Sequence, residues 1–483
     1  MRLYRIALII CLISVPNVTL YAQQDALELN INEVNHLALE NNFDIQVYKL
    51  DKRISEKELL KAQAVYDTTL DASYKYDRDK LDRSSVIFGE KTVAIGQSAT
   101  LEKTLPSGTI LSLGADHTRQ ATDSSFSTLN PYHESTATIS VTQSLGKNAL
   151  GIIDRNTVKI TGLDVENTGY TSMDKIEAEL ADTQRSYWNL LLAYKNVEVT
   201  QEIMDGAKSL YLNSQKNFDI GLVEPPELYA VQANLKQRQR DVLLANDKLS
   251  AALNRMRFKL NLSKDTVVKP ADEFKPEEIG VSFEEVIASA LGSRRDYKQA
   301  KNDVKAMDLY IQMKKNSLWP QIDLKGTFKR NGLAAKFNDS IKEITSQNQY
   351  EYAVEVIFSF PLENSTARAE YSQKELEKAK ALVNLKKTEC LILVQTHDAY
   401  IHAKNTYDAV KLQKEAKELE HKKYLGEEDR FNKGRSDTDR LIRYQQDYLR
   451  ASLAYLRGLY EYESALINLK TVMNRLLQAD GEI

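Results

Sequence analysis

The stretch Phe218-Asp219-Ile220-Gly221, followed by Glu227-Leu228, recurs as Phe431-Asn432-Lys433-Gly434, followed by Arg440-Leu441. In both copies an aromatic residue lies three positions before a glycine, and a charged residue and a leucine lie six and seven positions after it. Long stretches with very little proline or glycine lead into and out of each copy. We therefore predict that each copy is the tip of a long antiparallel helical hairpin, and that the chain contains this hairpin twice.

The segments before the hairpins are duplicated as well. Glu33-Val34 matches Glu285-Val286 at an offset of 252 residues, and the offset falls to 213 at the two tip glycines, so the first half has extra residues in its strand region. The sequence of each half predicts the same order of elements: a helix, strands, a long helix, a tip and a second long helix. The predicted organisation is a signal peptide (1–22), a first repeat (23–262), a linker (263–281), a second repeat (282–477) and a C-terminal tail (478–483).

Composition narrows the class of protein. Of 483 residues, 28% are charged, yet the formal net charge is only −3, and the absence of a basic excess argues against nucleic acid as a partner. A hydrophobic content of 42% with high charge and few helix breakers favours long amphipathic helices that bury one stripe against each other.

The N-terminus predicts export from the cytoplasm. Arg2 and Arg5 precede an apolar segment from Ile6 to Val15, and Ala22 offers a small residue for cleavage. A buried N-terminal strand is the alternative. Because Cys11 lies inside the expected signal peptide, Cys390 would stand alone in the mature chain, which excludes an intrachain disulfide.

Several segments alternate in polarity, as β-strands do. After the signal peptide no stretch reaches the length of about 18 apolar residues that a membrane helix needs, so a membrane crossing would require strands closed into a barrel. A soluble β-sandwich is the alternative. The candidate strand residues are Leu70, Ala72, Tyr74 and Tyr76; Val93, Ile95 and Ala99; Ile110, Leu111 and Leu113; Ile139, Val141 and Leu145; Ile322, Leu324 and Phe328; and Tyr352, Val354, Val356, Phe358 and Phe360.

The connections between these strands are unequal. Leu105-Pro106-Ser107-Gly108 predicts a tight turn, whereas the segments 77–90, 120–133 and 331–349 are long and polar, as in outer-membrane barrels. The extra hairpin at 97–117 either joins the barrel, giving six strands per chain, or folds outside it, leaving four. Aromatic residues could form interfacial girdles: Tyr74, Tyr76, Tyr132, Tyr350, Tyr352, Phe358 and Phe360.

Helix length indicates a spanning role. The helix expected from Asp154 to Phe218 has roughly 60 residues, which at about 1.5 Å per residue is on the order of 90 Å, a distance suited to bridging a compartment.

In this ordered pattern, the chain from about Leu29 to Leu477 resembles the TolC-type outer-membrane efflux proteins (outer membrane factors). The resemblance rests on the two tips, on Tyr187-Trp188, and on the segments that flank strands: Gln143-Ser144-Leu145, Trp319-Pro320-Gln321 and Phe360-Pro361-Leu362. It implies a mainly α-helical fold with a membrane β-barrel portion, in which three copies share one barrel and their helical hairpins form a tunnel. It also implies a location in the outer membrane of a Gram-negative bacterium, with the helical portion in the periplasm.

The same resemblance implies the partners. The homotrimer would contact outer membrane lipid, a periplasmic adaptor (membrane fusion) protein and an inner-membrane pump of the RND, ABC or MFS type. It would act as a passive exit duct in a tripartite efflux or type I secretion system.

Residues of the tips acquire roles in this comparison. Gly221 and Gly434 would adopt positive φ, and Phe218 and Phe431 would pin each tip to its neighbour. In similar proteins these tips meet the adaptor, and Glu227 matches the acidic residue that lines the narrow end of the tunnel.

Arg440 departs from the family pattern, because an aspartate is usual at its position. Our hypothesis is that Asp437, Asp439 and Arg440 form the constriction, where a ring of arginines would repel cations and a ring of aspartates would attract them. The alternative is that Arg440 pairs with Asp437 or Asp439 on a solvated surface.

We expect no catalytic, cofactor-binding or metal site, and no cofactor. His397 and His402 are five residues apart, which is off the spacing of a helical zinc pair, and acidic runs such as Glu427-Glu428-Asp429 are interpreted as solvated helix faces. The competing non-enzymatic functions are a periplasmic coiled-coil adaptor, which would have one hairpin and compact β-domains, and a structural coiled-coil protein.

Overall fold

The computed structural model describes residues 26–82, 87 and 89–477. The expected signal peptide at 1–22, with Cys11, and the expected tail at 478–483 lie outside these residues.

The chain divides into two compact units. Of the described residues, the hairpin unit contains those within Met1–Asn42, Thr183–Lys275 and Val410–Tyr460, and the sheet unit those within Phe43–Asp182, Pro276–Ala409 and Glu461–Ile483. The division crosses both expected repeats, because three long helices contribute to both units: α3 (Ile152–Asp219), α8 (Ser365–Asn432) and α9 (Thr438–Val472). The boundaries of the repeats stay a prediction.

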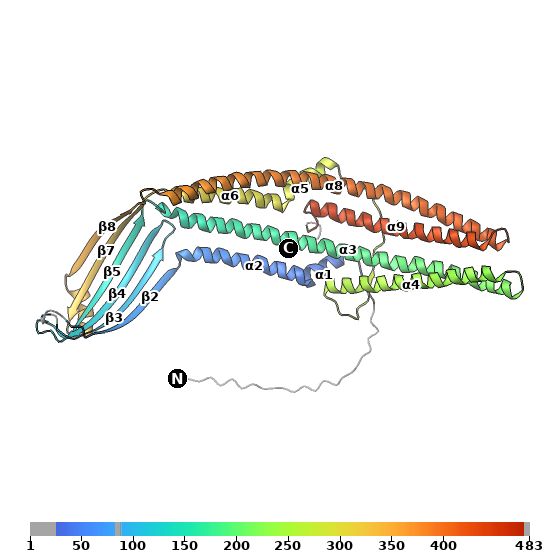
Figure 1. Ribbon diagram of the computed structural model, residues 1–483. Helices are drawn as coiled ribbons and strands as arrows, with labels where there is room; N and C mark the ends of the chain where they lie inside the picture. The colour runs from blue at the N-terminus through green and yellow to red at the C-terminus, as the bar shows by residue number, and fades with distance from the viewer. Residues whose placement is uncertain (1–25, 83–86, 88, 478–483) are drawn as a thin grey trace, which may run out of the picture. The chain divides into compact units, whose positions relative to one another are not determined.

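In the hairpin unit, α3 turns back into α4 (Pro225–Leu260) and α8 turns back into α9, so both predicted hairpins are present (Figure 1). Apolar residues of all four helices form its core, and Leu210, Val231 and Leu441 make one buried cluster near the tips. A short parallel pair, β1 (Leu27–Leu29) with β6 (Val268–Pro270), also belongs to this unit.

The matching segments Glu33-Val34 and Glu285-Val286 have the same local structure. They lie at the starts of α1 (Ile31–Asn41) and α5 (Phe283–Ser293), where the two glutamates complete capping boxes with Asn30 and Ser282. The two valines, one position later, are both fully buried. The duplication therefore conserves a helix start and the first buried residue of each helix.

The sheet unit contains one antiparallel sheet of six strands in the order β2-β3-β4-β5-β7-β8. The expected extra hairpin forms β3 and β4 within this sheet, and the tight turn at Leu105–Gly108 joins them. Figure 1 shows the strands gathered at one end of the sheet unit, with the helices α2 and α6 leading into it. The bounds are α2 (Phe43–Gln63), β2 (Thr68–Asp79), β3 (Thr92–Thr104), β4 (Thr109–Thr122), β5 (Tyr132–Ser144), α6 (Arg295–Asn316), β7 (Gln321–Ala334) and β8 (Tyr350–Ser359).

Two details of the sheet differ from expectation. The segment 331–349 is not simply a long loop, because β7 continues to Ala334 and a ten-residue helix, α7 (Phe337–Ser346), follows it. Tyr132 lies an odd number of residues before Ile139, so alternation places its side chain on the opposite face of the sheet. Its hydroxyl donates to Gln120 Oε1 (2.7 Å), which removes Tyr132 from the expected girdle.

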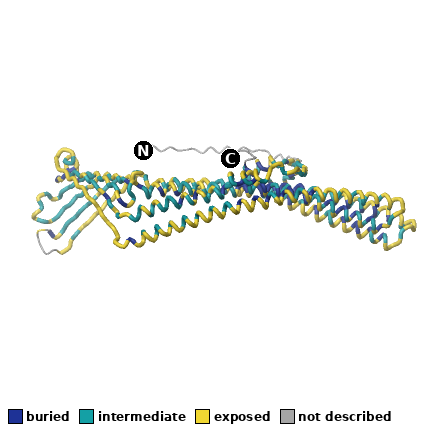
Figure 2. The backbone as a smooth tube through the Cα atoms, turned by 90° about the horizontal axis from the view of Figure 1, so that it is seen from above, coloured by how far each residue is buried: buried dark blue, intermediate teal, exposed yellow. Residues whose placement is uncertain are grey.

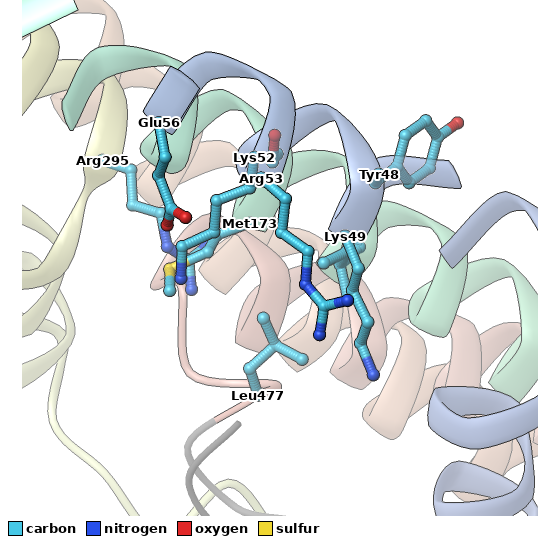
Figure 3. A pocket seen from close by; sticks show the side chains of 10 residues that line it. Tyr48, Lys49, Lys52, Arg53, Glu56, Met173, Arg295 and Leu477 are labelled. Carbon is cyan, nitrogen blue, oxygen red and sulfur yellow. The ribbon is translucent and has the colours of Figure 1, made fainter. Parts of the chain in front are cut away.

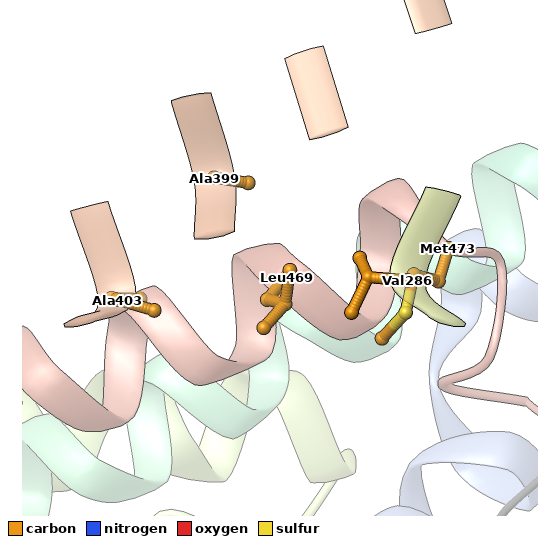
Figure 4. Packing of buried hydrophobic residues seen from close by; sticks show 6 residues of the cluster. Val286, Ala399, Ala403, Leu469 and Met473 are labelled. Carbon is orange, nitrogen blue, oxygen red and sulfur yellow. The ribbon is translucent and has the colours of Figure 1, made fainter. Parts of the chain in front are cut away.

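Helices of the sheet unit pack through small residues. Ala399 and Ala403 of α8 form one buried cluster with Ala465 and Leu469 of α9, with Met473 just after α9 and with Val286 of α5 (Figure 4). Figure 2 shows few buried positions in the sheet itself, whereas buried positions recur along the helices. Within the described part of the chain, no helix is both long and apolar enough to cross a membrane.

Candidate functional site

The candidate site is the pair of hairpin tips in the hairpin unit. Gly221 has φ +77° and Gly434 has φ +67°, which confirms the predicted positive φ at both glycines. The amide of Gly221 donates to the Phe218 carbonyl (2.9 Å), and the amide of Leu222 donates to the Asn217 carbonyl (2.8 Å). The second tip repeats both bonds, from Gly434 to Phe431 (2.9 Å) and from Arg435 to Arg430 (2.8 Å). Both tips are therefore Schellman-type helix ends.

The helices that leave the two tips begin differently. Two prolines, Pro225 and Pro226, open α4, where the missing amide donors have no helical acceptor and φ is already suitable. In the second tip the Asp437 carboxylate accepts from the Arg440 amide (2.8 Å) and caps the start of α9. Asp437 is therefore a structural residue of the second tip.

A hydrogen bond joins the two tips. Thr438 Oγ1, at the start of α9, donates to Glu227 Oε1, in the first turn of α4. Because an ionised carboxylate is the acceptor, this is one of the stronger kinds of hydrogen bond. Glu227 therefore ties the first hairpin to the second.

The Arg440 guanidinium pairs within its own hairpin. Its Nη2 lies 3.4 Å from Asp437 Oδ2, and its Nη1 lies 3.9 Å from Glu427 Oε1. The pair with Asp437 is the one that the alternative interpretation anticipated. The Arg440 side chain is nevertheless 43% exposed, so it keeps access to solvent.

Glu427 was interpreted from the sequence as part of a solvated acidic face, and this is wrong. It is 4% exposed and accepts a hydrogen bond from the Ser436 hydroxyl, while Arg430 Nη1 lies 3.8 Å away. Its position on the buried side of α8 depends on how α8 meets α9, which a run of three acidic residues does not reveal.

Polar groups also lie in the seam behind the tips. Gln445 is buried, donates to the Ile203 carbonyl (3.3 Å) and accepts from Asn234 Nδ2 (3.3 Å). The Tyr424 hydroxyl donates to Glu428 Oε1 (3.1 Å), and burial together with that carboxylate raises the pKa of Tyr424. These hydrogen bonds give partners to buried polar groups, which would destabilise the fold if they were left unpaired.

The two tip aromatics are not equivalent. Phe431 packs against the cluster of Leu210, Val231 and Leu441, to which both hairpins contribute. Phe218 is half-buried and lies outside that cluster. That either phenylalanine pins its tip to the neighbouring hairpin stays a prediction.

The strand-flanking residues lie in the sheet unit. Pro320 directly precedes β7, and its carbonyl accepts from the Lys147 amide (2.9 Å), while Pro361 follows β8. Trp319 is exposed at the same junction. These residues mark where helix changes to strand, away from the tip residues in the sequence.

A separate cavity of about 530 Å³ lies in the sheet unit between α2 and α3. Figure 3 shows Lys52 and Arg53 of α2 reaching toward Met173 and Leu477. The Arg295 guanidinium at the cavity is bonded to Asp174 (2.9 Å) and Glu177 (2.5 Å), so its charge is neutralised within the protein. On α2 the cavity is lined by three cations and one carboxylate, Lys49, Lys52, Arg53 and Glu56, and Met173, Ile176 and Leu477 supply apolar surface.

Part of the chain matches a known protein family. Residues 286–475 match the family described as outer membrane efflux protein. The match confirms the resemblance to TolC-type outer membrane factors over these residues. A search among curated proteins finds no match to the chain.

Solved structures extend the likeness to nearly the whole chain. The CmeC outer membrane channel of Campylobacter jejuni matches with a TM-score of 0.68 and 15% identity, over 98% of this chain and 94% of that chain. The outer membrane protein VceC of Vibrio cholerae gives 0.67 and 12%, over 92% and 95%. The open state of the Neisseria gonorrhoeae MtrE channel gives 0.66 and 14%, over 95% and 94%. At these identities the likeness establishes the fold, and the predicted fold class is confirmed.

Proposed function

We propose that three copies of this chain form a passive exit duct across the outer membrane and periplasm of a Gram-negative bacterium. The duct would receive cargo from an inner-membrane pump through a periplasmic adaptor. The observation that carries this proposal is the polarity of the two faces of the sheet.

One face of the sheet is apolar and exposed. The strand register aligns one apolar or aromatic residue from each strand in a continuous row, and every member of the row is exposed: Leu70, Leu101, Leu113, Ile139, Phe328 and Tyr352. An exposed apolar surface of this extent, which no described segment of the chain covers, suits contact with lipid.

The opposite face is mainly polar. The neighbouring row across the same six strands is Asp71, Thr100, Gly114, Thr138, Lys329 and Glu351. Polar residues inside and apolar residues outside are the arrangement of a water-filled membrane barrel. A soluble adaptor or a coiled-coil protein would have no use for an apolar outer face, which disfavours both alternatives.

The sheet has two open edges. Within the described residues, β2 and β8 each pair on one side only, and all ten residues of β8 are exposed. Unpaired edges cannot persist in a membrane, so further copies would have to complete the pairing, with β2 of one copy beside β8 of the next. Each copy would contribute six strands.

The helices next to these edges support the same closure. Helix α2, which precedes β2, exposes Phe43, Val47, Leu50 and Ile54 at helical spacing. Helix α8, which follows β8, exposes Leu376, Val383 and Val394 in its first half. Copies joined at their strand edges would bring these two apolar stripes together.

The tips are assigned two roles in this proposal. Phe218, Gly221, Glu227, Phe431 and Gly434 shape the surface that docks the adaptor. Asp437, Asp439 and Arg440 form the constriction, in which the exposed part of Arg440 would oppose the passage of cations.

Migration and mass of the purified protein test the duct. We expect a heat-modifiable trimer with bound detergent, whereas a water-soluble monomer extracted without detergent would contradict the proposal. Conductance of the reconstituted protein tests the constriction. Arg440→Asp should raise cation selectivity, and unchanged selectivity with unchanged current would exclude Arg440 from the pore.

A further inference from the structure

The short helix α7 lies in the connection between β7 and β8, at the end of the sheet where β5 begins and β7 ends. It packs against β5 and β7. The Phe337 ring meets the His117 ring edge-on, with the ring centroids 4.6 Å apart. The helix is therefore attached to the sheet along its length and is not a free loop.

Alternation along the strands shows which face α7 covers. Its contact residues His117 of β4 and Ser135 of β5 lie an even number of positions from Leu113 and Ile139, so all four share the apolar face. On β7, α7 packs against Gly332, which lies on the same face two residues after Arg330. The apolar part of this face ends at Arg330. The helix thus covers the outer face immediately past its apolar band.

Helix α7 packs closely against β5 and β7. The Ser340 side chain is fully buried, and its hydroxyl lies 2.9 Å from the Ser135 hydroxyl. The Glu343 carboxylate accepts from the Leu333 amide (2.9 Å). A Cβ at Gly332 would come within 2.0 Å of the Ser340 carbonyl oxygen, so only glycine permits this approach.

The side of α7 that is left open is apolar. Phe337 and Ile341, one helical turn apart, are 43% and 44% exposed. Lys336 and Lys342 are also exposed and supply cations at the two margins of this stripe. An apolar stripe bordered by lysines is typical of a helix that lies in the surface of a membrane.

We propose that α7 is a membrane-surface helix, with Phe337 and Ile341 among the outermost acyl chains and the two lysines at the phosphate groups of the lipid headgroups. The inference rests on the proposed function, because it requires the apolar band of the sheet to face lipid. Continuity between that band and the exposed stripe of α7 identifies lipid as the occupant.

Fluorescent probes on single cysteines test this placement. In a Cys11→Ser, Cys390→Ser background, the full-length protein would carry a probe at Ile341→Cys on α7, at Val354→Cys in the band, or at Leu412→Cys on an exposed part of α8. The vesicles would be phosphatidylcholine with phosphatidylglycerol, brominated at shallow or deep positions of the acyl chains. We expect deep bromines to quench the Val354 probe, shallow bromines to quench the Ile341 probe, and neither to quench the Leu412 probe.

The outcomes separate the two proposals. Quenching at Val354 but aqueous iodide quenching at Ile341 would overturn the α7 inference and leave the duct standing. An Ile341 probe shielded from both bromine and iodide would show that protein covers α7, which also overturns it. Loss of lipid quenching at Val354 would refute the membrane role of the sheet. Phe337→Cys provides a second probe on α7 should Ile341→Cys fail to fold.

Further variants test how α7 packs on the sheet and what its two lysines contribute. Gly332→Ala should displace α7 and reduce shallow quenching at Ile341, whereas Gly326→Ala on the same strand, where a Cβ meets nothing within 4 Å, should not. Lys336→Gln with Lys342→Gln should reduce quenching only in vesicles that contain phosphatidylglycerol. An equal reduction without the anionic lipid would contradict the role given to the lysines.

Discussion

The two hairpin tips have nearly the same backbone and different side-chain chemistry. Gly221 and Gly434 share positive φ and the same pair of amide–carbonyl bonds. Glu227 in the first tip bonds across to Thr438 of the second hairpin, whereas Arg440 in the second tip pairs with Asp437 and Glu427 of its own hairpin. The backbone of a tip is set by a few local bonds, so its charges are free to diverge between the copies.

Among substitutions at the tips, we expect the largest loss of stability at Glu427, whose carboxylate is buried. Removing it in Glu427→Ala leaves the Ser436 hydroxyl and the Arg430 and Arg440 guanidinium groups without this partner. We expect the free energy of local opening of the second tip to fall by about 2 kcal/mol, as for other hydrogen bonds to charged groups. Hydrogen exchange of the tip peptides measures this. The exposed neighbour Asp429→Ala is the control, and equal losses in the two variants would refute the distinction.

Replacing Gly221 or Gly434 with alanine should destabilise the two tips to a similar extent. In both, the left-handed conformation penalises a Cβ, and neither has any atom within 4 Å that a methyl group would meet. Gly221→Ala and Gly434→Ala should each destabilise their own tip by about 1–2 kcal/mol. Gly426→Ala, inside α8 and also free of close neighbours, should instead stabilise the helix by about 0.5–1 kcal/mol. Clearly unequal losses at Gly221 and Gly434 would break the equivalence of the backbones.

The hydrogen bond between Glu227 and Thr438, which joins the two tips, should contribute a smaller but measurable coupling free energy than the loss expected for Glu427→Ala. A double-mutant cycle of Glu227→Ala and Thr438→Ala isolates it, because each single change removes one partner of the bond. We expect a coupling free energy of about 1 kcal/mol in hydrogen exchange of the first tip. Glu224→Ala with Thr438→Ala is the matched control, and a coupling as large there would remove the special role of Glu227.

The parts of the fold that depend on local chemistry could be predicted. Glycine three residues after an aromatic indicated both tips, and period-two alternation indicated the strands. Features set by contacts between distant segments could not. Glu427 is buried because of the way α8 meets α9, and Tyr132 lies on the polar face because it is an odd number of residues from Ile139 along β5. Helix α7 was missed because ten mostly polar residues resemble a loop until Gly332 and Ser135 provide a seat for them.

The smallest effect should come from an exposed ion pair that only the second tip has. Asp429 and Lys433 lie 2.6 Å apart at helical spacing, with both side chains more than half exposed. The corresponding residues of the first tip, Lys216 and Ile220, cannot form such a pair. Solvent screening limits an exposed pair to about 0.3–0.5 kcal/mol, so Lys433→Gln should weaken the second tip by that amount at low salt and by less at high salt.

The pair can also be moved to the first tip. Lys216→Asp with Ile220→Lys should stabilise the first tip by a similar amount, because the backbones there are alike and the pair depends on helical spacing alone. Thermal unfolding at low and high salt would compare the variants. A gain in one tip without the matching loss in the other would mean that the tips differ in backbone as well as in charge.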